Sequence, residues 1–393
     1  MSGKSFKQQL IVIFIVRLLL NTGRRFIYPF APALSRELAV PLTAVTSIIA
    51  TSQFVSLLGL FSGPLADRIG NRILMRAGLL ILAIGMLLCG LVPEYWFVFV
   101  GLLLASLGKT LFDPAIQSFI GRYVPYARRS RAVGFIETAW AGSTLLSIPA
   151  LGVIIEHLGL RVSFFILAIL AACGWLLIAW ALPRDLQKGA VVEKGNGILL
   201  RIFCLFKHRA AAGMLLFGFW ISLANDALFV IYGVWFENAF AVSLVTLGFS
   251  TIAIGGAELL GELSTAFFSD RVGPKRMICI CMGILIAAYL LLPVIGTSLL
   301  LAMIGMFLIF FFFEIVIVTS FSLSSEIMIH SRATMLAGYY AIMGIGRVVG
   351  VFLAGTAWKL GGIAAVTASC ALCTLLGLIT LWVGLHRWQP EKE

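Results

Sequence analysis

The sequence predicts an all-α polytopic membrane protein with about twelve transmembrane helices. Hydrophobic residues make up 61% of the 393 residues, charged residues make up only 12%, and the mean hydropathy is +1.06. A water-soluble domain of this length does not carry so large an apolar fraction. Apolar runs of about 20 residues, the length that crosses a bilayer as a helix, recur from one end of the chain to the other.

The predicted spans fall into two groups of six, separated by the only long polar interval in the chain. The first six lie at residues 8–34, 42–66, 73–93, 96–122, 132–156 and 162–182. The second six lie at residues 210–236, 246–268, 277–295, 299–325, 333–358 and 363–385. An even number of spans places both termini on the same side of the membrane.

The distribution of basic residues predicts which side that is. The formal net charge is +12. Of the 29 Lys and Arg residues, 21 fall on the side of the termini, counting Arg76 and Arg122 at the span ends there, 5 fall deeper within spans, and 3 fall on the opposite side (Arg36, Arg161 and Lys359). Basic loops stay in the cytoplasm, so both termini should be cytoplasmic, in a multi-pass protein of the cytoplasmic (inner) membrane. The positive charge is thus an orientation signal, and we expect no nucleic-acid partner.

The polar interval also divides an internal repeat. We expect an N-terminal six-helix bundle at residues 1–182, a cytoplasmic linker at 183–209 and a C-terminal six-helix bundle at 210–393. An offset of 204 residues superposes Asn21 on Asn225, and an offset of 203 superposes Asp67 on Asp270. A nearly constant offset indicates two homologous halves, as in many carriers, with the substrate bound near the middle of the bilayer.

A short motif joins spans two and three, where residues 63–72 read GPLADRIGNR. It resembles the loop signature of the major facilitator superfamily, G-x-L-a-D-r-x-G-r-k, through Gly63, Asp67, Arg68, Gly70 and Arg72. The second half repeats it more weakly through Asp270, Arg271 and Gly273. The resemblance implies the fold of that family, two six-helix bundles around a central cavity, and secondary transport by alternating access.

The chemistry of the motif is consistent with a gate. Gly70 permits a tight turn. Asp67 is an anion that can accept backbone N–H groups at a neighbouring helix N-terminus, where the helix dipole favours negative charge. We therefore expect the motif to hold the cytoplasmic side closed in one transport state.

Ionisable residues inside spans are costly in a bilayer, and in the first half they are mainly basic. Arg17, Asn21, Arg24 and Tyr28 share one face of the first span, with Arg25 on its flank. In the fourth span Lys109 and Asp113, at i and i+4, either form an internal ion pair or line the cavity. The residues that we expect to contact substrate are Asn21, Arg24, Arg25, Tyr28, Lys109, Asp113, Asp226, Tyr232, Glu314 and Arg347.

The embedded residues of the second half are mainly acidic. They are Asp226, Glu258, Glu262 and Glu314, against the single base Arg347. Carboxylates withdrawn from water bind protons more readily, so these four are the candidates for proton coupling. Two alternatives stay open: Glu258 and Glu262 form a structural network with Arg347, or Arg24 and Asp226 pair with each other.

These features favour a proton-coupled carrier of a small organic anion or zwitterion, since Arg24 and Arg25 are fixed cations. The alternatives are a drug or amphiphile efflux antiporter, favoured by the aromatic tenth span, and a lipid-headgroup translocator. An incomplete fifth-span export signature at residues 148–152 and the arginines of span one count against efflux. A membrane sensor or enzyme is a remote alternative.

The expected partners follow from the same features. The four histidines lie at span ends and in loops, and no nucleophile or metal motif is present, so we expect no enzyme activity, no metal site and no cofactor. The partners should be a small-molecule substrate, protons and the lipid bilayer, and the protein should act as a monomer.

Overall fold

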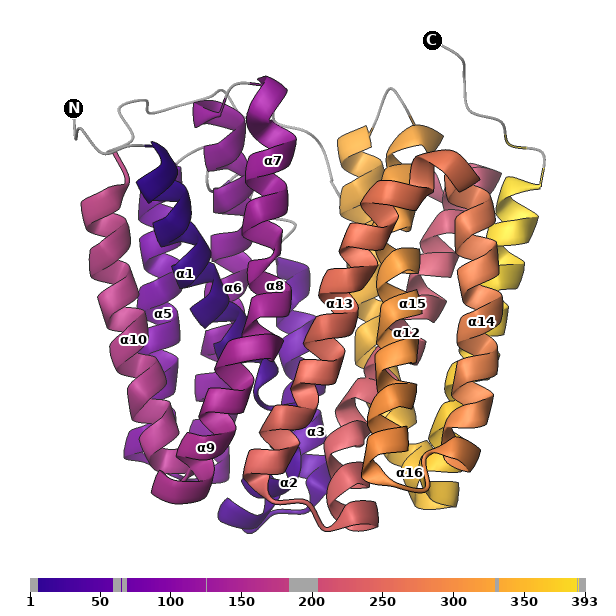
Figure 1. Ribbon diagram of the computed structural model, residues 1–393. Helices are drawn as coiled ribbons and strands as arrows, with labels where there is room; N and C mark the ends of the chain where they lie inside the picture. Colours follow the sequence, from indigo (N-terminus) through magenta and orange to yellow (C-terminus); the bar gives the residue numbers. More distant parts are fainter. Residues whose placement is uncertain are drawn as a thin grey trace. The chain divides into compact units, whose positions relative to one another are not determined.

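The computed structural model describes residues 6–58, 69–124, 126–183, 204–328 and 332–386, with Leu65 and Trp388, and every regular element in these ranges is a helix (Figure 1). The helices that precede the linker are α1 (Phe6–Arg25), α2 (Ala31–Glu37), α3 (Leu42–Val55), η1 (Ser56–Leu58), α5 (Asn71–Leu91), α6 (Tyr95–Tyr123), α7 (Tyr126–Glu137), α8 (Ala139–Gly142), η2 (Ser143–Ser147), α9 (Ile148–Leu158) and α10 (Leu160–Ala181). Those that follow it are α12 (Arg209–Phe240), α13 (Leu244–Val272), α14 (Pro274–Ile295), α15 (Leu299–Ile327) and α16 (Arg332–Leu385).

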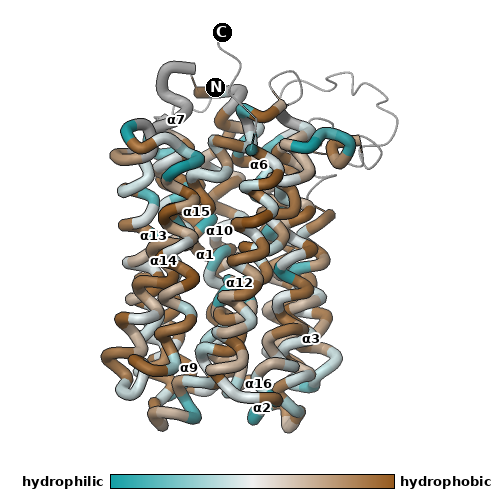
Figure 2. Tube along the Cα trace, turned by 90° about the vertical axis from the view of Figure 1, so that its right-hand side faces the viewer, coloured by the Kyte–Doolittle hydropathy of each residue, from teal (hydrophilic) through white to brown (hydrophobic). Residues whose placement is uncertain are grey.

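The predicted all-α polytopic membrane fold is confirmed. Within the described ranges, nine helices are long and apolar enough to cross a membrane. Hydrophobic residues run along the helices, and hydrophilic residues gather toward their ends (Figure 2). One of the nine, α16, contains a break at Gly361 and Gly362, so it supplies two of the predicted spans. The helix α1 falls outside the nine because Lys7 and its arginines lower its hydropathy.

The first predicted span, residues 8–34, is not one continuous helix. The helix α1 ends at Arg25, residues 26–30 form turns, and α2 begins at Ala31. The reason is Pro29, because proline disfavours helical geometry at the preceding residue and donates no backbone hydrogen bond. A second proline, Pro32, occupies the first turn of α2, where its missing N–H is harmless.

The fifth predicted span, residues 132–156, is also irregular. It consists of α7, α8 and α9, with the π-helical turn η2 at Ser143–Ser147 between α8 and α9. Pro149 lies at the start of α9, directly after this turn. Proline cannot donate to the carbonyl one turn earlier, and a π-type turn accommodates that missing bond.

Left-handed backbone conformations reveal the internal repeat in three dimensions. In the described ranges the residues with positive φ form three pairs at offsets of 202 or 203 residues: Ala39 with Ala241, Gly70 with Gly273, and Gly159 with Gly362. Each pair occupies the same kind of position, next to a helix end or at the break in α16. Because alanine adopts positive φ only at a cost, the Ala39 and Ala241 pair argues for a shared backbone design.

The chain divides into two compact units. One comprises Met1–Glu193 with Val242–Gly255, and the other comprises Lys194–Ala241 with Gly256–Glu393. The first part of α13 therefore belongs to the first unit. The boundaries at 182 and 210 follow the sequence repeat, whereas the units follow spatial contact, so the division into two bundles and a linker stays a prediction.

Close helix packing within each unit depends on glycine. In the first unit, α5 and α6 cross through two glycine pairs, and a Cβ atom at Gly78 would lie 2.5 Å from the Gly108 carbonyl oxygen. In the second unit, a Cβ atom at Gly346 of α16 would lie 2.3 Å from the Phe219 carbonyl oxygen of α12. Small residues let membrane helices approach closely, and backbone contact holds these pairs in a defined register.

Candidate functional site

The polar face of α1 supplies the first group of candidate residues. Asn21 is fully buried, and Arg17 and Arg25 are buried with 7% and 2% of their surface exposed. The helix packs against α10, α6, α8 and η2, so its polar side chains meet other helices of the first unit rather than lipid. Burial of two cations and an amide on one helix is expensive in a membrane protein and marks a functional region.

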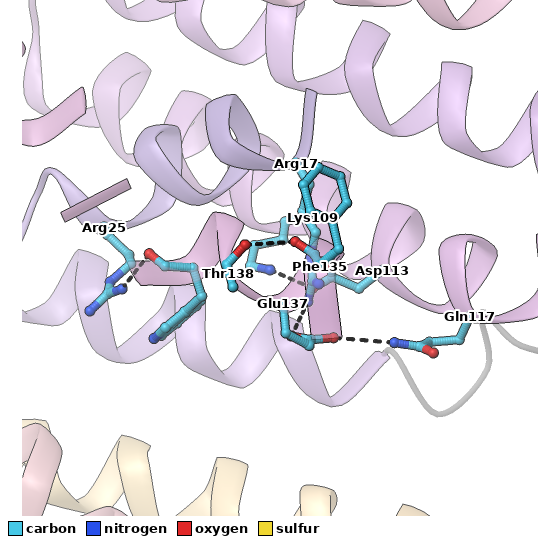
Figure 3. A network of polar contacts seen from close by, with 9 residues as sticks. Arg17, Arg25, Lys109, Asp113, Gln117, Phe135, Glu137 and Thr138 are labelled. Atoms are coloured by element: carbon cyan, nitrogen blue, oxygen red, sulfur yellow. Dashed lines mark hydrogen bonds and ion pairs between the residues drawn. The ribbon is translucent and has the colours of Figure 1, made fainter. Parts of the chain in front are cut away.

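Arg17 joins α1 to α6 and α7 through two carboxylates. Its Nη2 lies 2.7 Å from Glu137 Oε2, and its Nε lies 3.5 Å from Asp113 Oδ1. Lys109 also binds Asp113, and Gln117 Nε2 donates to Glu137 Oε1 at 3.3 Å (Figure 3). The ion-pair interpretation of Lys109 and Asp113 therefore matches the geometry. Two cations and two carboxylates, Arg17, Lys109, Asp113 and Glu137, thus form a cluster whose formal charge is zero.

Arg25 is held by a tryptophan. Its Nη1 donates to the Trp140 carbonyl oxygen at 3.2 Å, and its guanidinium carbon lies 4.0 Å from the centre of the Trp140 ring. Lys109 Nζ lies 5.6 Å from the same ring. Cations are attracted to the face of an indole ring, so Trp140 fixes two cations without neutralising either charge.

Arg24 points toward a different helix. Its Nη2 donates to Gln53 Oε1 of α3 at 2.5 Å, and Gln53 Nε2 donates in turn to the Tyr28 hydroxyl. The expected common face of Arg24 and Tyr28 is thus realised through Gln53, although Tyr28 lies beyond the end of α1. Gln53 has 4% of its surface exposed, and an amide does not change the charge of this contact.

Arg24 and Arg25 are connected to the cluster around Arg17. Arg24 interacts electrostatically with Lys109 and Asp113 as well as donating to Gln53. Arg25 shares the Trp140 ring with Lys109. Four cations and two carboxylates, Arg17, Arg24, Arg25, Lys109, Asp113 and Glu137, therefore form one polar region of the first unit.

The second unit contains an ion pair between two of its helices, α12 and α16. Asp226 Oδ2 of α12 lies 3.7 Å from Arg347 Nε of α16, and Asp226 has 6% of its surface exposed. Arg347, which the sequence offered as a partner for Glu258 and Glu262, therefore pairs with Asp226. On α12 next to this pair, the buried hydroxyl of Ser222 and the Oδ1 atom of Asn225 have no hydrogen-bond partner in the described structure.

The remaining predicted residues of the second unit lie on three different helices, α12, α13 and α15. Tyr232 is fully buried and stacks on Phe229, with ring centres 5.6 Å apart. Glu314 of α15 has 7% of its surface exposed and packs against Gly261 of α13. A side chain at position 261 would not fit beside it, since a Cβ atom added to Gly261 would lie 2.7 Å from Glu314 Cβ. Glu258 is buried, with 3% exposed, and Glu262 is half-buried on the same helix.

Only some residues of the loop motif and of its repeat in the second half lie within the described part of the structure. Gly63, Asp67 and Arg68 lie outside the described residues, as does most of the segment 183–209. Gly70 precedes α5 with a φ of 93°, and Gly273 precedes α14 with a φ of 86°. Asp270 and Arg271 lie in the last turn of α13, and Arg271 is exposed.

A basic residue two positions after each of these glycines caps the last helix of its half. Arg72 Nη2 donates to the Ala179 carbonyl oxygen of α10, and Lys275 Nζ donates to the Leu385 carbonyl oxygen of α16 at 2.7 Å. A cation at a helix C-terminus satisfies a carbonyl that has no partner within the helix. The motif thus has a structural role in both halves, beyond any role in gating.

Sequence reasoning missed two residues, Gln53 and Trp140. Gln53 had a usable signal, because it is a lone amide in an apolar span. Trp140 had none, since an isolated tryptophan in a membrane helix is usually a lipid contact. Among the described residues, no three His, Cys, Asp or Glu side chains come together as metal ligands would.

The helical membrane fold, its internal repeat and the buried charged residues define the chain as a polytopic transporter of a known family. The chain belongs to the Major Facilitator Superfamily, whose family model matches residues 13–328. The predicted family is therefore confirmed.

The individual relatives share less than 30% of their aligned residues with this chain. The uncharacterised MFS-type transporter YwfA of Bacillus subtilis is 23% identical over 349 residues, which cover 87% of this chain and 84% of the relative. The multidrug resistance protein MdtG of Salmonella arizonae is 27% identical over 301 residues, which cover 74% of this chain and 73% of the relative. A solved bacterial homologue of the human lysosomal transporter Spinster, in an inward-facing and unoccupied conformation, has the same fold, with a TM-score of 0.66 and 14% identity over 97% of this chain and 96% of the other.

Proposed function

We propose that the protein is a proton-coupled secondary transporter that moves a small organic anion or zwitterion by alternating access. One observation carries the choice of substrate class, the two adjacent arginines at the end of α1 beside the buried amide of Asn21, whose side-chain atoms have no hydrogen-bond partner in the described structure. Fixed cations within a membrane segment favour an anionic ligand, and an unsatisfied amide favours a ligand with polar groups. Arg24 and Arg25 are the proposed anchors, with Asn21 and Tyr28 beside them.

The contacts of both arginines support this assignment. Arg24 donates to the Gln53 amide oxygen and Arg25 donates to the Trp140 carbonyl oxygen, and these contacts orient the two guanidinium groups. Arginine is suited to binding a carboxylate or phosphate because it stays charged and offers several N–H donors in one plane.

Asp226 is the proposed proton carrier. It is buried, it is a carboxylate, and its pairing with Arg347 couples its protonation to the position of a cation on another helix. When Asp226 binds a proton, its attraction for Arg347 falls, which changes the interaction between α12 and α16. Glu258, Glu262 and Glu314 are further candidates for the same role. In this proposal both termini face the cytoplasm and the monomer is the transporting unit.

Export of drugs or amphiphiles is the second candidate function. It is favoured by the similarity to multidrug resistance proteins named MdtG and by the aromatic side chains of α15. Phe307 and Phe311 stack with ring centres 6.1 Å apart, and Phe310 contacts Phe229. Binding sites for amphiphiles combine such apolar walls with a few polar anchors.

A ligand-panel measurement separates the two candidates. Purified protein is heated with small carboxylates, with phosphate esters and with cationic amphiphiles, because a ligand that binds only the folded state raises the unfolding temperature. Stabilisation by anions and not by cationic amphiphiles is expected. The reverse pattern would contradict the anion proposal and favour drug export.

Proton coupling is tested by flux in proteoliposomes. An imposed pH gradient should drive accumulation of the anion in the wild type, whereas Asp226→Asn should abolish accumulation and leave exchange of labelled for unlabelled solute intact. Lys359→Gln is the matched control, since it removes one charge from an exposed position. Accumulation by Asp226→Asn at the wild-type level would remove Asp226 from the coupling role.

A further inference from the structure

Three polar side chains of α12 lie along one strip of its surface. Ser222 is one turn before Asp226, and Asn225 is just under one turn after Ser222. At about 100° per residue, Ser222 projects roughly 40° from Asp226 on one side and roughly 60° from Asn225 on the other. Side chains at these spacings are neighbours on a helix, whereas consecutive side chains diverge. Ser222 is therefore the middle member of the strip.

The two neutral members of the strip lack hydrogen bonds. Ser222 has 1% of its surface exposed, and its Oγ atom has no partner in the described part of the chain. Asn225 is half-buried, but its Oδ1 atom is buried and likewise has no partner there. A buried polar atom without a hydrogen bond is costly, so a second state of the protein that satisfies both atoms is favoured.

The strip is short of one proton. An ionised carboxylate and an amide oxygen only accept hydrogen bonds, so the hydroxyl of Ser222 is the single donor between the two acceptors. The carboxylate of Asp226 is instead directed to α16, where its Oδ2 atom lies 3.7 Å from Arg347 Nε. A proton on Asp226 turns its carboxyl group into a donor, and the strip then contains enough donors for a continuous chain of hydrogen bonds.

The groups around Asp226 are compatible with this change. Arg347 supplies the opposite charge from α16, and its side chain keeps 29% exposure, so it retains access to water when Asp226 is neutral. From α14, the fully buried Tyr289 interacts electrostatically with Asp226, and its hydroxyl has no hydrogen-bond partner in the described ranges. Cys370 of α16 donates to the backbone of α12 at 3.1 Å, and Glu314 of α15 packs against α13. Arg347 thus supplies the charge that a proton on Asp226 replaces.

Resting on the proposed role of Asp226 as proton carrier, we infer that Ser222 and Asn225 are positioning residues that hold its protonated form. The Asp226 O–H donates to Ser222 Oγ, and the Ser222 O–H donates to Asn225 Oδ1. The proton comes from water, bonds to a carboxylate oxygen of Asp226, and returns to water when the carboxylate pairs with Arg347 again. Protonation thereby exchanges a contact between α12 and α16 for hydrogen bonds within α12, which gives the proton a means of altering how these two helices pack.

The experiment follows the protonation of Asp226 by infrared spectroscopy of the full-length protein in lipid vesicles over a range of pH. A protonated carboxylic acid has a carbonyl stretching band that a carboxylate lacks, and the part of this band that Asp226→Asn removes in the same background belongs to Asp226. Ser222→Ala and Asn225→Leu each remove one link of the chain and so disfavour the protonated form. In each variant the Asp226 band should require about three- to tenfold higher proton concentration than in the wild type. Ser222→Thr keeps the hydroxyl and should titrate like the wild type.

Controls and the sign of the shift keep the outcomes distinct. Ser324→Ala is the matched control, because Ser324 is a fully buried serine whose hydroxyl already bonds within α15, and it should leave the Asp226 band unchanged. The unfolding temperature shows that each variant is folded, and Asn225→Ala replaces Asn225→Leu if the latter does not fold. If Ser222 instead donates to the ionised carboxylate, Ser222→Ala makes the band appear at higher pH.

That opposite shift, or an unchanged midpoint in either variant, overturns the inference about Ser222 and Asn225 and leaves Asp226 as the proton carrier. A wild-type spectrum that Asp226→Asn does not alter at any pH overturns the coupling role of Asp226, and the inference with it.

Discussion

Replacing Arg17 with glutamine should destabilise the first unit more than any other single change in its charged cluster. The side chain of Arg17 has 8% of its surface exposed and bridges Asp113 and Glu137 at 3.5 and 2.7 Å. Removing one partner of a buried pair costs about 3–5 kcal/mol, because the remaining charge is left without compensation. Here the carboxylates keep 32% and 38% exposure, so water compensates in part and about 2 kcal/mol is expected.

The companion variants test the origin of that cost. Arg17→Gln changes the formal charge of the cluster from zero to −1, whereas the double variant Arg17→Gln with Glu137→Gln restores it to zero. Glu137→Gln alone leaves Arg17 bound to Asp113 and should cost about 1 kcal/mol. The double variant should therefore be more stable than Arg17→Gln alone, since neighbouring charges are not additive.

The assay is the unfolding temperature of purified protein at constant detergent and pH. A loss of about 2 kcal/mol lowers the midpoint by roughly 4–8 °C for a unit of this size, and Lys359→Gln should leave it unchanged. A double variant whose loss equals the sum of the two single losses would refute the electrostatic reasoning and show that Arg17 acts through packing alone.

Three further predictions concern orientation, gating and packing. A single cysteine introduced into the linker at 183–209, in a background without other cysteines, should resist an impermeant thiol reagent in intact cells, and rapid labelling would reverse the proposed orientation. Asp67→Asn should slow transport in reconstituted vesicles and leave the unfolding temperature nearly unchanged; flux at the normal rate would remove the latch role from the motif. Gly78→Leu should lower the unfolding temperature strongly, because its Cβ would meet the Gly108 carbonyl oxygen at 2.5 Å, whereas Gly283→Leu, where a Cβ meets nothing within 4 Å, is the matched control and should be tolerated.

The membrane fold and most of its spans could be predicted from the sequence, because bilayer thickness imposes a length and an apolar composition on every span. The main error of detail comes from proline, because Pro29 divides the predicted span at residues 8–34 into α1 and α2. The predicted span at 132–156 is confirmed by the apolar stretch Ala132–Leu158, although a π-helical turn precedes Pro149 within it. Hydropathy registers neither feature, because both concern missing backbone hydrogen bonds rather than polarity.

The candidate site was predicted less completely than the fold. Helical spacing placed Arg17, Asn21 and Arg24 on one face, and it placed Lys109 and Asp113 within reach of each other. Spacing along one helix does not identify partners on other helices, so Gln53 and Trp140 were found only from the structure. Those two residues show that Arg24 contacts α3 and Arg25 contacts α8.

Solute counterflow in proteoliposomes tests the proposed anion site most directly. Vesicles loaded with the unlabelled anion that stabilises the protein most in the ligand panel are diluted into the same anion in labelled form. A second set is loaded with an unlabelled cationic amphiphile and diluted into its labelled form. The wild type and Lys359→Gln should exchange the anion, whereas the double variant Arg24→Gln with Arg25→Gln should not, although it remains folded. Exchange of the cationic amphiphile alone by the wild type, or undiminished anion exchange by the double variant, would contradict the assignment of Arg24 and Arg25 as the anion site.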